Sequence, residues 1–194
     1  MAGIPDNQTP DAIDVAARNA EHQPLRIRQL IPRDAEAFHY LRLRCIEANP
    51  TSFSVLLEEE RGMSLSQLHS LLERFYRAEN AALWGAFCGD YLVGMIGLEP
   101  LLGPVRQHRG IVTSLCVLPE YRGQNVGQAL IAHLIEYAKA NVALESLVLE
   151  VSEPSKAAIH LYRKAGFEQN GTEPKALAFG EQRINLIRMH LALN

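Results

Sequence analysis

The chain has 194 residues, 47% of them hydrophobic and 21% charged, with a formal net charge of −3 at pH 7. This length and composition fit a single soluble globular domain that can bury a sizeable core. Nucleic-acid binding is disfavoured because it needs a concentrated basic surface, and the sequence contains no run of Lys and Arg. A membrane partner is not expected either, because no apolar stretch approaches the length of a membrane span.

The N-terminal segment and the cysteines indicate the cellular compartment. Residues 1–21 lack the basic start and the apolar core of a secretion signal. The three cysteines, Cys45, Cys88 and Cys116, are an odd number scattered through apolar segments, which favours reduced, buried thiols over disulfides. Both features predict a cytoplasmic protein.

The sequence divides into a polar N-terminal segment and one domain. Residues 1–24 are polar and carry three prolines, so they are predicted to be a flexible extension with at most one short helix over residues 12–20. The domain is predicted to occupy residues 25–194. It begins with an alternation of apolar and polar side chains over residues 25–31, as in a half-buried strand.

A helix is predicted over residues 34–48, where apolar side chains form one stripe, and Asn49-Pro50 ends it. Four arginines in this strand and helix alternate in a way that indicates solvated faces: Arg26, Arg28, Arg42 and Arg44. Residues 51–63 are predicted to be a loop or a frayed turn.

A second helix is predicted to begin at a capping box formed by Ser64 and Gln67. Its apolar face comprises Leu65, Leu68, Leu72 and Phe75. A β-hairpin is predicted next, because apolar runs over residues 81–88 and 91–99 are separated by the two-residue turn Gly89-Asp90.

The C-terminal half alternates strands and helices before ending in two strands. Residues 107–117 are almost continuously apolar or β-branched, as in a central strand. The helix that follows carries an apolar stripe, and residues 144–151 read as another buried strand. A helix over residues 155–165 is predicted to end at Gly166, and the last two strands start near residues 167 and 183.

The stretch over residues 117–130, V-L-P-E-Y-R-G-Q-N-V-G-Q-A-L, has the layout of an anion-binding loop. Gly123, Asn125 and Gly127 adopt unusual backbone angles at low cost, so that consecutive N–H groups can point at one phosphate from a helix N-terminus. Arg122 adds a positive charge. An ordinary strand-to-helix connection would carry a similar pattern, whereas a P-loop NTPase is excluded because the chain has no G-x-x-x-x-G-K-S/T.

Two segments resemble motifs of the GNAT superfamily of acyl-CoA-dependent N-acyltransferases. Residues 121–127, Y-R-G-Q-N-V-G, resemble the family's pyrophosphate loop, with Arg122 and Gly127 at the ends of the pattern Arg/Gln-x-x-Gly-x-Gly/Ala. Asn125 stands where the family usually has Gly, and it is the residue type that most readily replaces Gly in the left-handed region. Residues 155–167 resemble N-x-x-A-x-x-L-Y-x-x-x-G-F, with Ser155 in place of Asn.

The order of predicted elements is also that of the GNAT fold. The resemblance therefore implies an α/β (α+β) domain with a mixed, mostly antiparallel twisted sheet of about seven strands flanked by about four helices. It implies an N-acetyltransferase that moves an acetyl group from acetyl-CoA directly to a primary amine of a small molecule or a protein N-terminus. The alternative is a non-catalytic acyl-CoA-binding regulatory module. Such a module would keep the loop but would need neither a general acid nor a general base, the roles for which Tyr162 and Glu150 are the candidates.

The resemblance implies a coenzyme A site at the end of one strand, in the loop and at the two helix starts. Backbone groups of residues 115–117 should contact the pantetheine arm and the thioester carbonyl. The cofactor-binding residues expected are Leu115, Cys116, Val117, Arg122, Gly123, Gln124, Asn125, Val126, Gly127, Gln128, Ser155 and Tyr162.

Tyr162 is the candidate general acid, since the family's corresponding tyrosine lies close to the thioester sulfur in many members. A phenol is a competent proton donor to the departing thiolate. The alternative is a core aromatic residue, because Tyr162 also fits the apolar face of its helix.

Glu150 is the candidate general base, by similarity to the glutamate of this strand in the ribosomal-protein N-terminal acetyltransferases. Alternation places it opposite Leu149 and Val151, so it could line a cleft where the sheet splays, or it could be a solvated carboxylate. Ile111 and Thr113 stand where other GNAT members carry Glu or His, which leaves Glu150 or a water as the base.

The remaining expectations are mostly negative. An acyl-cysteine intermediate on Cys116 is not expected, because no His or basic residue adjoins it in sequence. No metal is expected, because the seven histidines show no ligand spacing. Acceptor choice should depend on residues 51–63 and 170–182, which carry no readable code; Glu58 to Glu60 would attract a cationic acceptor or form a solvated face. A homodimer stays open.

Overall fold

The computed structural model describes residues 23–140 and 143–193. Most of the expected flexible extension over residues 1–24, including its short helix over residues 12–20, therefore lies outside the described residues.

Seven strands form one mixed sheet in the order β1-β2-β3-β4-β5-β7-β6. Neighbouring strands are antiparallel except β4 and β5, which are parallel. The strand predicted to be central, β4, is the fourth of the seven. The strands are β1 (Leu25–Gln29), β2 (Ala82–Cys88), β3 (Tyr91–Pro100), β4 (Arg109–Val117), β5 (Ser146–Ser152), β6 (Glu168–Phe179) and β7 (Gln182–Ala192).

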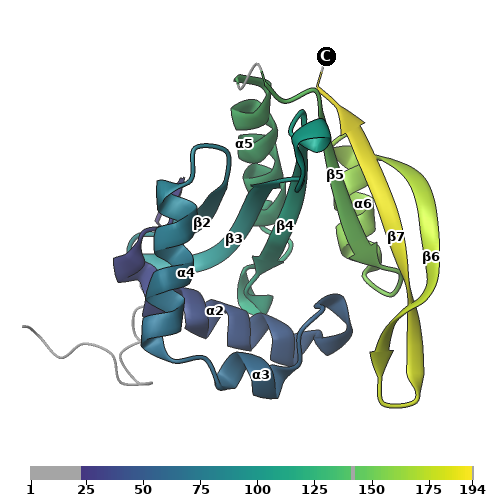
Figure 1. The fold of residues 1–194 in the computed structure, drawn as a ribbon. Coiled ribbons are helices and arrows are strands. Elements are labelled where there is room, and N and C mark those ends of the chain that lie inside the picture. Colours follow the sequence, from purple (N-terminus) through teal and green to yellow (C-terminus); the bar gives the residue numbers. More distant parts are fainter. Residues whose placement is uncertain (1–22, 141–142, 194) are drawn as a thin grey trace, which may run out of the picture.

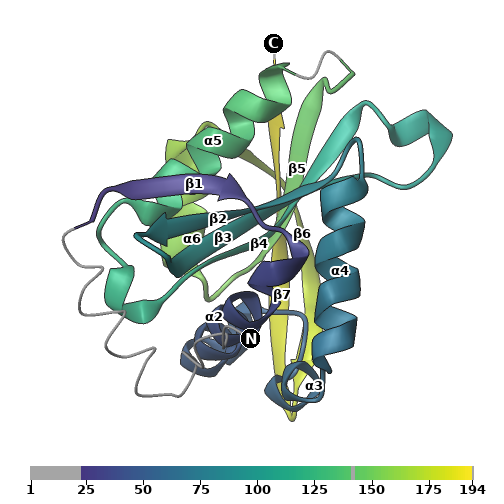
Figure 2. The same ribbon diagram turned by 90° about the vertical axis from the view of Figure 1, so that its left-hand side faces the viewer.

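Helices cover the sheet on both faces (Figures 1 and 2). Three of them, α2, α3 and α4, lie on one side, and α5 and α6 lie on the other. This arrangement confirms the expected fold class, with five α-helices in the described residues where about four were expected. The helices are α2 (Ala35–Ala48), α3 (Leu57–Arg61), α4 (Leu65–Arg77), α5 (Val126–Ala140) and α6 (Lys156–Lys164).

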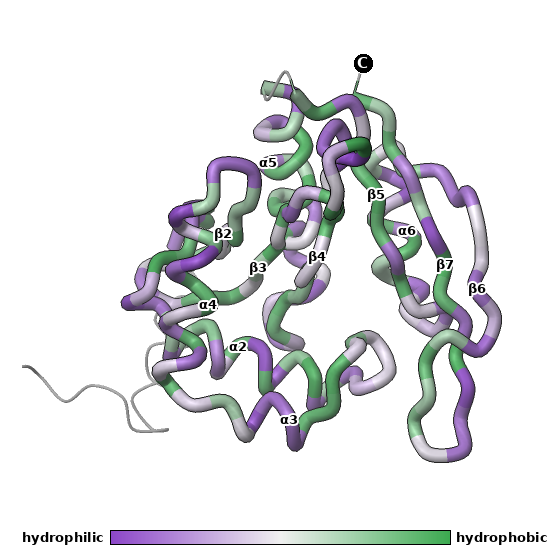
Figure 3. Tube along the Cα trace, in the orientation of Figure 1, coloured by the Kyte–Doolittle hydropathy of each residue, from purple (hydrophilic) through white to green (hydrophobic). Residues whose placement is uncertain are grey.

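Hydrophobic residues concentrate in the inner strands, whereas the edge strand β6 is largely hydrophilic (Figure 3). All seven residues of β2 are buried, and β3 is buried over most of its length. Both faces of these strands are covered, so that they read as continuous apolar runs.

Helix α3 corrects the expectation of a loop or frayed turn over residues 51–63. Glu60, which is 3% exposed, accepts hydrogen bonds of 2.6 Å from both Nε and Nη2 of Arg42 on α2. The Leu56 backbone N–H donates to the Glu59 carboxylate and caps the helix. A tertiary ion pair thus fixes a turn that has little apolar patterning of its own.

The same ion pair corrects the expectation that the four arginines are solvated. Arg42 is buried by α3, and Arg28 donates two hydrogen bonds of 2.7 and 2.8 Å to the buried carboxylate of Asp34. Arg26 and Arg44 keep exposed side chains.

The local signals for helix and strand ends are confirmed. The Gln67 N–H donates to Ser64 Oγ, and the Ser64 N–H donates to Gln67 Oε1. Gly166, with φ 96°, ends α6. Leu65 departs from the expectation, because this first-turn residue is exposed while the rest of the predicted face is buried.

A β-bulge in β4 shapes the molecule at its centre. The register between β3 and β4 shifts between Met95 and Gly97, and Ser114 in the bulge takes φ 58°. Pairing with β5 covers only three residues and ends at Ile111 opposite Val148. Beyond that point the two parallel strands separate and leave a gap in the sheet.

Candidate active site

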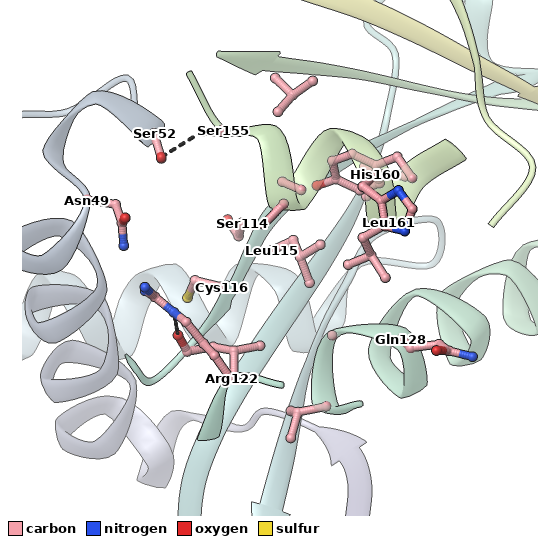
Figure 4. A pocket seen from close by; sticks show the side chains of 18 of the residues that line it. Asn49, Ser52, Ser114, Leu115, Cys116, Arg122, Gln128, Ser155, His160 and Leu161 are labelled. Carbon is pink, nitrogen blue, oxygen red and sulfur yellow. Dashed lines mark hydrogen bonds between the residues drawn. The ribbon is translucent and has the colours of Figure 1, made fainter. Parts of the chain in front are cut away.

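A cleft of about 500 Å³ occupies the gap between β4 and β5. Its walls are formed by residues 112–117 of β4, the loop into α5, the end of β5, one side of α6 and residues 49–53 after α2. Almost all the residues that the sequence points to therefore meet in one place (Figure 4).

The exposed edge of β4 forms one wall. Beyond Ile111, the strand's side toward β5 has no ladder partner in the described sheet. Backbone N–H and C=O groups in this position require partners from elsewhere. Residues 115–117 can therefore form main-chain hydrogen bonds with an extended ligand that lies in the gap in the position of a neighbouring strand.

The loop between β4 and α5 has the geometry of an anion-binding site. Gly123 takes φ 75° and Asn125 takes φ 62°, both in the left-handed region. The Ala129 N–H donates to the Asn125 carbonyl, so α5 starts here and the N–H groups of its first turn have no helical acceptor. The loop is thus suited to phosphate through backbone donors and the helix dipole.

Side chains around the loop hold it against the cleft. Arg122 Nε donates to the Val117 carbonyl at 3.1 Å, and the guanidinium lies beside Cys116 (Figure 4). A Cβ at Gly127 would lie 3.1 Å from Leu161 Cδ2, so glycine allows α5 to approach α6 closely. Gln124 does not line the cleft; its Nε2 donates to the Glu120 carbonyl.

Ser155 joins the two halves of the cleft. Its Oγ lies 2.7 Å from Ser152 Oγ and 2.7 Å from Ser52 Oγ (Figure 4). This chain of three hydroxyls links the end of β5 to the segment after α2. Residues 49–53 are thereby held across the mouth of the cleft.

Tyr162 lines the cleft from α6 and is only 7% exposed. Its ring packs edge-on against Phe167 at 5.8 Å between centroids. Burial raises the pKa of the Tyr162 phenol well above its ordinary value, and a negative charge on the nearby Cys116 would raise it further. The phenol is thus a buried aromatic residue and also a protonated donor facing the cleft.

Cys116 also lines the cleft, and its thiol contacts that of Cys45 on α2. The hydrogen bond between them, together with burial, raises the pKa of Cys116 well above its usual range. The charges of Arg42 and Arg122 lower the pKa of Cys116 by less. Basic residues do therefore approach this thiol, contrary to the expectation from sequence neighbours, yet it stays protonated.

Glu150 lines the cleft and is solvent-exposed, so both interpretations of its position hold. Its Oε1 accepts from Arg188 Nε at 2.9 Å. Arg188 also pairs with Glu173 on β6. The carboxylate is thus part of a charge ladder across β5, β7 and β6.

The family model described as Acetyltransferase (GNAT) family matches residues 36–167, more than half of the chain. The chain belongs to this family.

Curated and solved relatives agree with that assignment. The chain is 34% identical over 87 residues to the N-alpha-acetyltransferase RimI of Mycobacterium tuberculosis, covering 45% of this chain and 52% of that protein. It spans about half or less of the length of the curated relatives that it matches.

Two solved structures show the same fold. A GNAT-family acetyltransferase from Streptococcus pneumoniae superposes with a TM-score of 0.79 at 23% identity, covering 88% of this chain and 100% of that one. A protein from Salmonella typhimurium solved with its cofactor acetyl-CoA gives a TM-score of 0.77 at 15% identity, covering 89% and 95%.

Sequence reasoning missed several residues of the GNAT cleft. Asn49, Ser52 and Phe53 reach it from the segment after α2, and Thr113, Ser114, His160 and Lys164 are among the other residues that line it. The bulge at Ser114 has no sequence signal, because serine gives no indication of a positive φ. Residues 49–53 follow an Asn-Pro helix stop, which predicts a loop but not its destination.

Metal and membrane features can be stated for the described part of the chain. Residues 23–140 and 143–193 contain no group of three or more His, Cys, Asp and Glu side chains that could hold a metal ion. None of their helices is both long and apolar enough to cross a bilayer.

Proposed function

We propose that this GNAT protein is an N-acetyltransferase that moves an acetyl group from acetyl-CoA directly to a primary amine. The observation that carries the proposal is the convergence, in one cleft, of a phosphate-binding loop, an unpaired strand edge and the buried phenol of Tyr162. Residues 25–194 form the catalytic domain, and we place the protein in the cytoplasm.

Coenzyme A would bind through its pyrophosphate at one end of the cleft and through its pantetheine arm, which contains peptide-like amides, at the other. The N–H groups of residues 123–128 and the Arg122 guanidinium suit the pyrophosphate. The amide-containing pantetheine arm suits the free edge of residues 115–117, and Ser155 lies at the start of α6 beside it. Gln124 takes no side-chain part in this scheme, because it turns toward Glu120.

The reaction requires one proton to leave the amine and one to reach the thiolate. The amine nitrogen forms a bond to the carbonyl carbon, the carbon–sulfur bond breaks, and the sulfur takes a proton from Tyr162. Loss of a positioned general acid typically costs about 10²–10⁴-fold in rate. Transfer is direct, since a Cys116 thiol with a raised pKa is a poor nucleophile.

Glu150 is the carboxylate that the resemblance points to as base, either directly or through water. Its position at the cleft and its partner Arg188 support a role in receiving the proton or in holding the cationic acceptor. Either a small amine or a protein N-terminus fits the side of β5 and β7 opposite α6, which none of the helices in residues 23–140 and 143–193 covers (Figure 1).

A panel assay tests the proposal. The protein is incubated with acetyl-CoA and separately with n-butylamine, a diamine, and hexapeptides that begin with different residues. Mass spectrometry should show a gain of one acetyl group on at least one acceptor, with release of an equal amount of free coenzyme A thiol. Acetyl-CoA binding without transfer to any acceptor would favour the non-catalytic module.

A further inference from the structure

Glu99 and Thr113 form a hydroxyl–carboxylate pair on neighbouring strands. Thr113 Oγ1 lies 3.4 Å from Glu99 Oε1 and donates to it. Thr113 is opposite Gly97, and a Cβ at Gly97 would lie 2.6 Å from Thr113 Oγ1. The missing side chain at Gly97 therefore provides the space that the hydroxyl occupies.

This pair points to the side of the sheet on which α2 and α4 lie. Trp84 of β2 packs against His133 and Tyr137 of α5, so its face is the one that α5 covers. The neighbouring position, Leu83, is opposite Gly97 and faces the other way. Side chains alternate along a strand, so Glu99 and Thr113 share the face of Leu83, which is the face of α2 and α4.

Thr113 occupies the point where the cleft opens. Pairing with β5 ends two residues earlier, at Ile111, and the bulge begins one residue later, at Ser114. Thr113 lines the cleft itself. Ile111 is opposite Val148, so alternation puts Glu150 on the same face, across the gap from Thr113.

The two carboxylates on this face differ in their partners. Glu150 is held by Arg188, which also pairs with Glu173. Within the described residues no ion pair involves Glu99, and its partner is the neutral hydroxyl of Thr113. Glu99 is opposite Ile111 on β4, Ile111 is opposite Val148 on β5, and Val148 is opposite His190 on β7. His190 is therefore the next titratable residue in the row of side chains that begins at Glu99.

We propose that Thr113 contacts the acceptor nitrogen and that Glu99 positions its hydroxyl and receives its proton. The inference rests on the proposed acetyl transfer. As the nitrogen bonds to the acetyl carbon, its proton passes to Thr113 Oγ1 and the Thr113 proton passes to Glu99. Glu99 then loses that proton to solvent, the sulfur takes its proton from Tyr162, and Tyr162 regains one from solvent, so atoms and charge balance.

The test compares pH profiles of the turnover number at saturating acetyl-CoA and saturating amine. The amine is the member of the panel above that gains most acetyl groups per minute. Glu99→Gln keeps an acceptor for the Thr113 hydroxyl but cannot take a proton, and Thr113→Val removes the hydroxyl while keeping the shape. Thr113→Ser restores the hydroxyl. Glu136→Gln on α5, on the opposite side of the sheet, is the matched control.

We expect Glu99→Gln and Thr113→Val each to lower the turnover number by about 10²-fold or more, as for loss of a general base. The acid-side fall of the wild-type profile should disappear in Glu99→Gln. The turnover number of Thr113→Ser should stay within about tenfold of the wild-type value. The turnover number of the control, Glu136→Gln, should equal that of the wild type. Melting temperature and coenzyme affinity should change little in all four.

Wild-type turnover in Glu99→Gln or in Thr113→Val would overturn the assignment. The assignment would also be overturned if the decrease in turnover number at low pH disappeared in Glu150→Gln and persisted in Glu99→Gln. If Thr113→Val or Glu99→Gln fails to fold, the turnover number of Thr113→Ser decides between two roles of Thr113. A proton relay needs only the hydroxyl, so the serine variant should be active. A packing role needs the methyl group, so the serine variant should be impaired. If the wild-type protein acetylates no amine, both the proposed function and this assignment fail. If the wild type and the variants are all equally active, only this assignment fails.

Discussion

The two walls of the cleft are built in different ways. The wall that we propose to hold the coenzyme, called here the coenzyme wall, consists of residues 115–117, which follow the bulge at Ser114, and residues 122–128, whose backbone angles are set locally by Gly123 and Asn125. The wall that we propose to face the acceptor, called here the acceptor wall, includes residues 49–53, which are far in sequence from the rest of the cleft: the Ser52 hydroxyl meets that of Ser155 across 103 positions. Local patterns can therefore specify the loop of the coenzyme wall, whereas the bulge in β4 and the acceptor wall depend on how the whole chain packs.

This difference leads us to expect separable effects of substitution. A change in the loop should alter coenzyme affinity and leave the acceptor side intact. A change in residues 49–63 should alter acceptor use or stability and leave coenzyme affinity intact. Tyr162 lies between the two walls and should affect turnover alone.

The largest effect is expected for Tyr162→Phe. The variant keeps the ring and its packing on Phe167 but removes the donor, so turnover should fall by about 10²–10⁴-fold with little change in coenzyme affinity. Tyr137→Phe on α5 is the control. Unchanged turnover would show that Tyr162 is a packing residue and that solvent protonates the thiolate.

The pH dependence follows from the direction of the Tyr162 pKa. The donor is the neutral phenol, and burial raises its pKa, so the donor persists above the pH at which an ordinary tyrosine ionises, about 10. The wild-type turnover number should therefore show no fall due to this group up to about pH 10. A fall near pH 9 that disappears in Tyr162→Phe would contradict the raised pKa.

Glu60→Gln should have the next largest effect, on stability. It leaves the buried Arg42 guanidinium without its charge partner, and breaking a buried ion pair costs about 3–5 kcal/mol. Urea unfolding should show this loss in the free energy of unfolding, while coenzyme affinity per folded molecule stays constant. Glu58→Gln, exposed in the same turn, should be close to neutral. A comparable loss of coenzyme affinity in Glu60→Gln would show that the two walls are coupled.

Coenzyme binding itself should stabilise the fold by mass action. At about 100 times its Kd, a ligand that binds only the native state adds about 2.7 kcal/mol. For a chain of this size that corresponds to a rise in Tm of about 5–10 °C. Acetyl-CoA and coenzyme A should each give this rise in a thermal scan, and ATP should give much less. No rise with either coenzyme would exclude the loop as its binding site.

The sequence predicted those parts of the molecule whose structure is decided within a few residues. The hairpin over residues 81–99 follows from a two-residue turn, and the left-handed backbone of the loop before α5 follows from Gly123 and Asn125. Helix α3 escaped prediction because its anchor, Glu60, pairs with Arg42 eighteen residues away.

The same physical reason limited prediction of the site. Glu150 and Tyr162 were placed at the cleft by motif, but the partner of Glu150, Arg188, lies 38 positions away. The Thr113–Glu99 pair depends on the register of β3 against β4 and on the absence of a side chain at Gly97. Neither register nor a bulge at a serine can be read from alternation alone.

The smallest effect, and the sharpest test of the coenzyme wall, is expected at Asn125. This residue takes φ 62°, where a β-branched side chain is strained by about 1–2 kcal/mol and glycine is not. In the valine variant the free loop can relax away from that angle, so coenzyme binding must restore it. Asn125→Val should therefore raise the Kd for acetyl-CoA by about 5–30-fold in titration calorimetry, since every 1.4 kcal/mol is tenfold.

Asn125→Gly is the matched comparison, since it lacks the side chain but adopts the required angle freely. It should bind within a few-fold of wild type, and Asn125→Ala should lie between the two. If the Val and Gly variants bind alike, the left-handed angle at this position does not serve coenzyme binding. A weak Gly variant would indicate instead that the Asn125 side chain itself contacts the coenzyme, so the pair of substitutions separates backbone geometry from side-chain recognition.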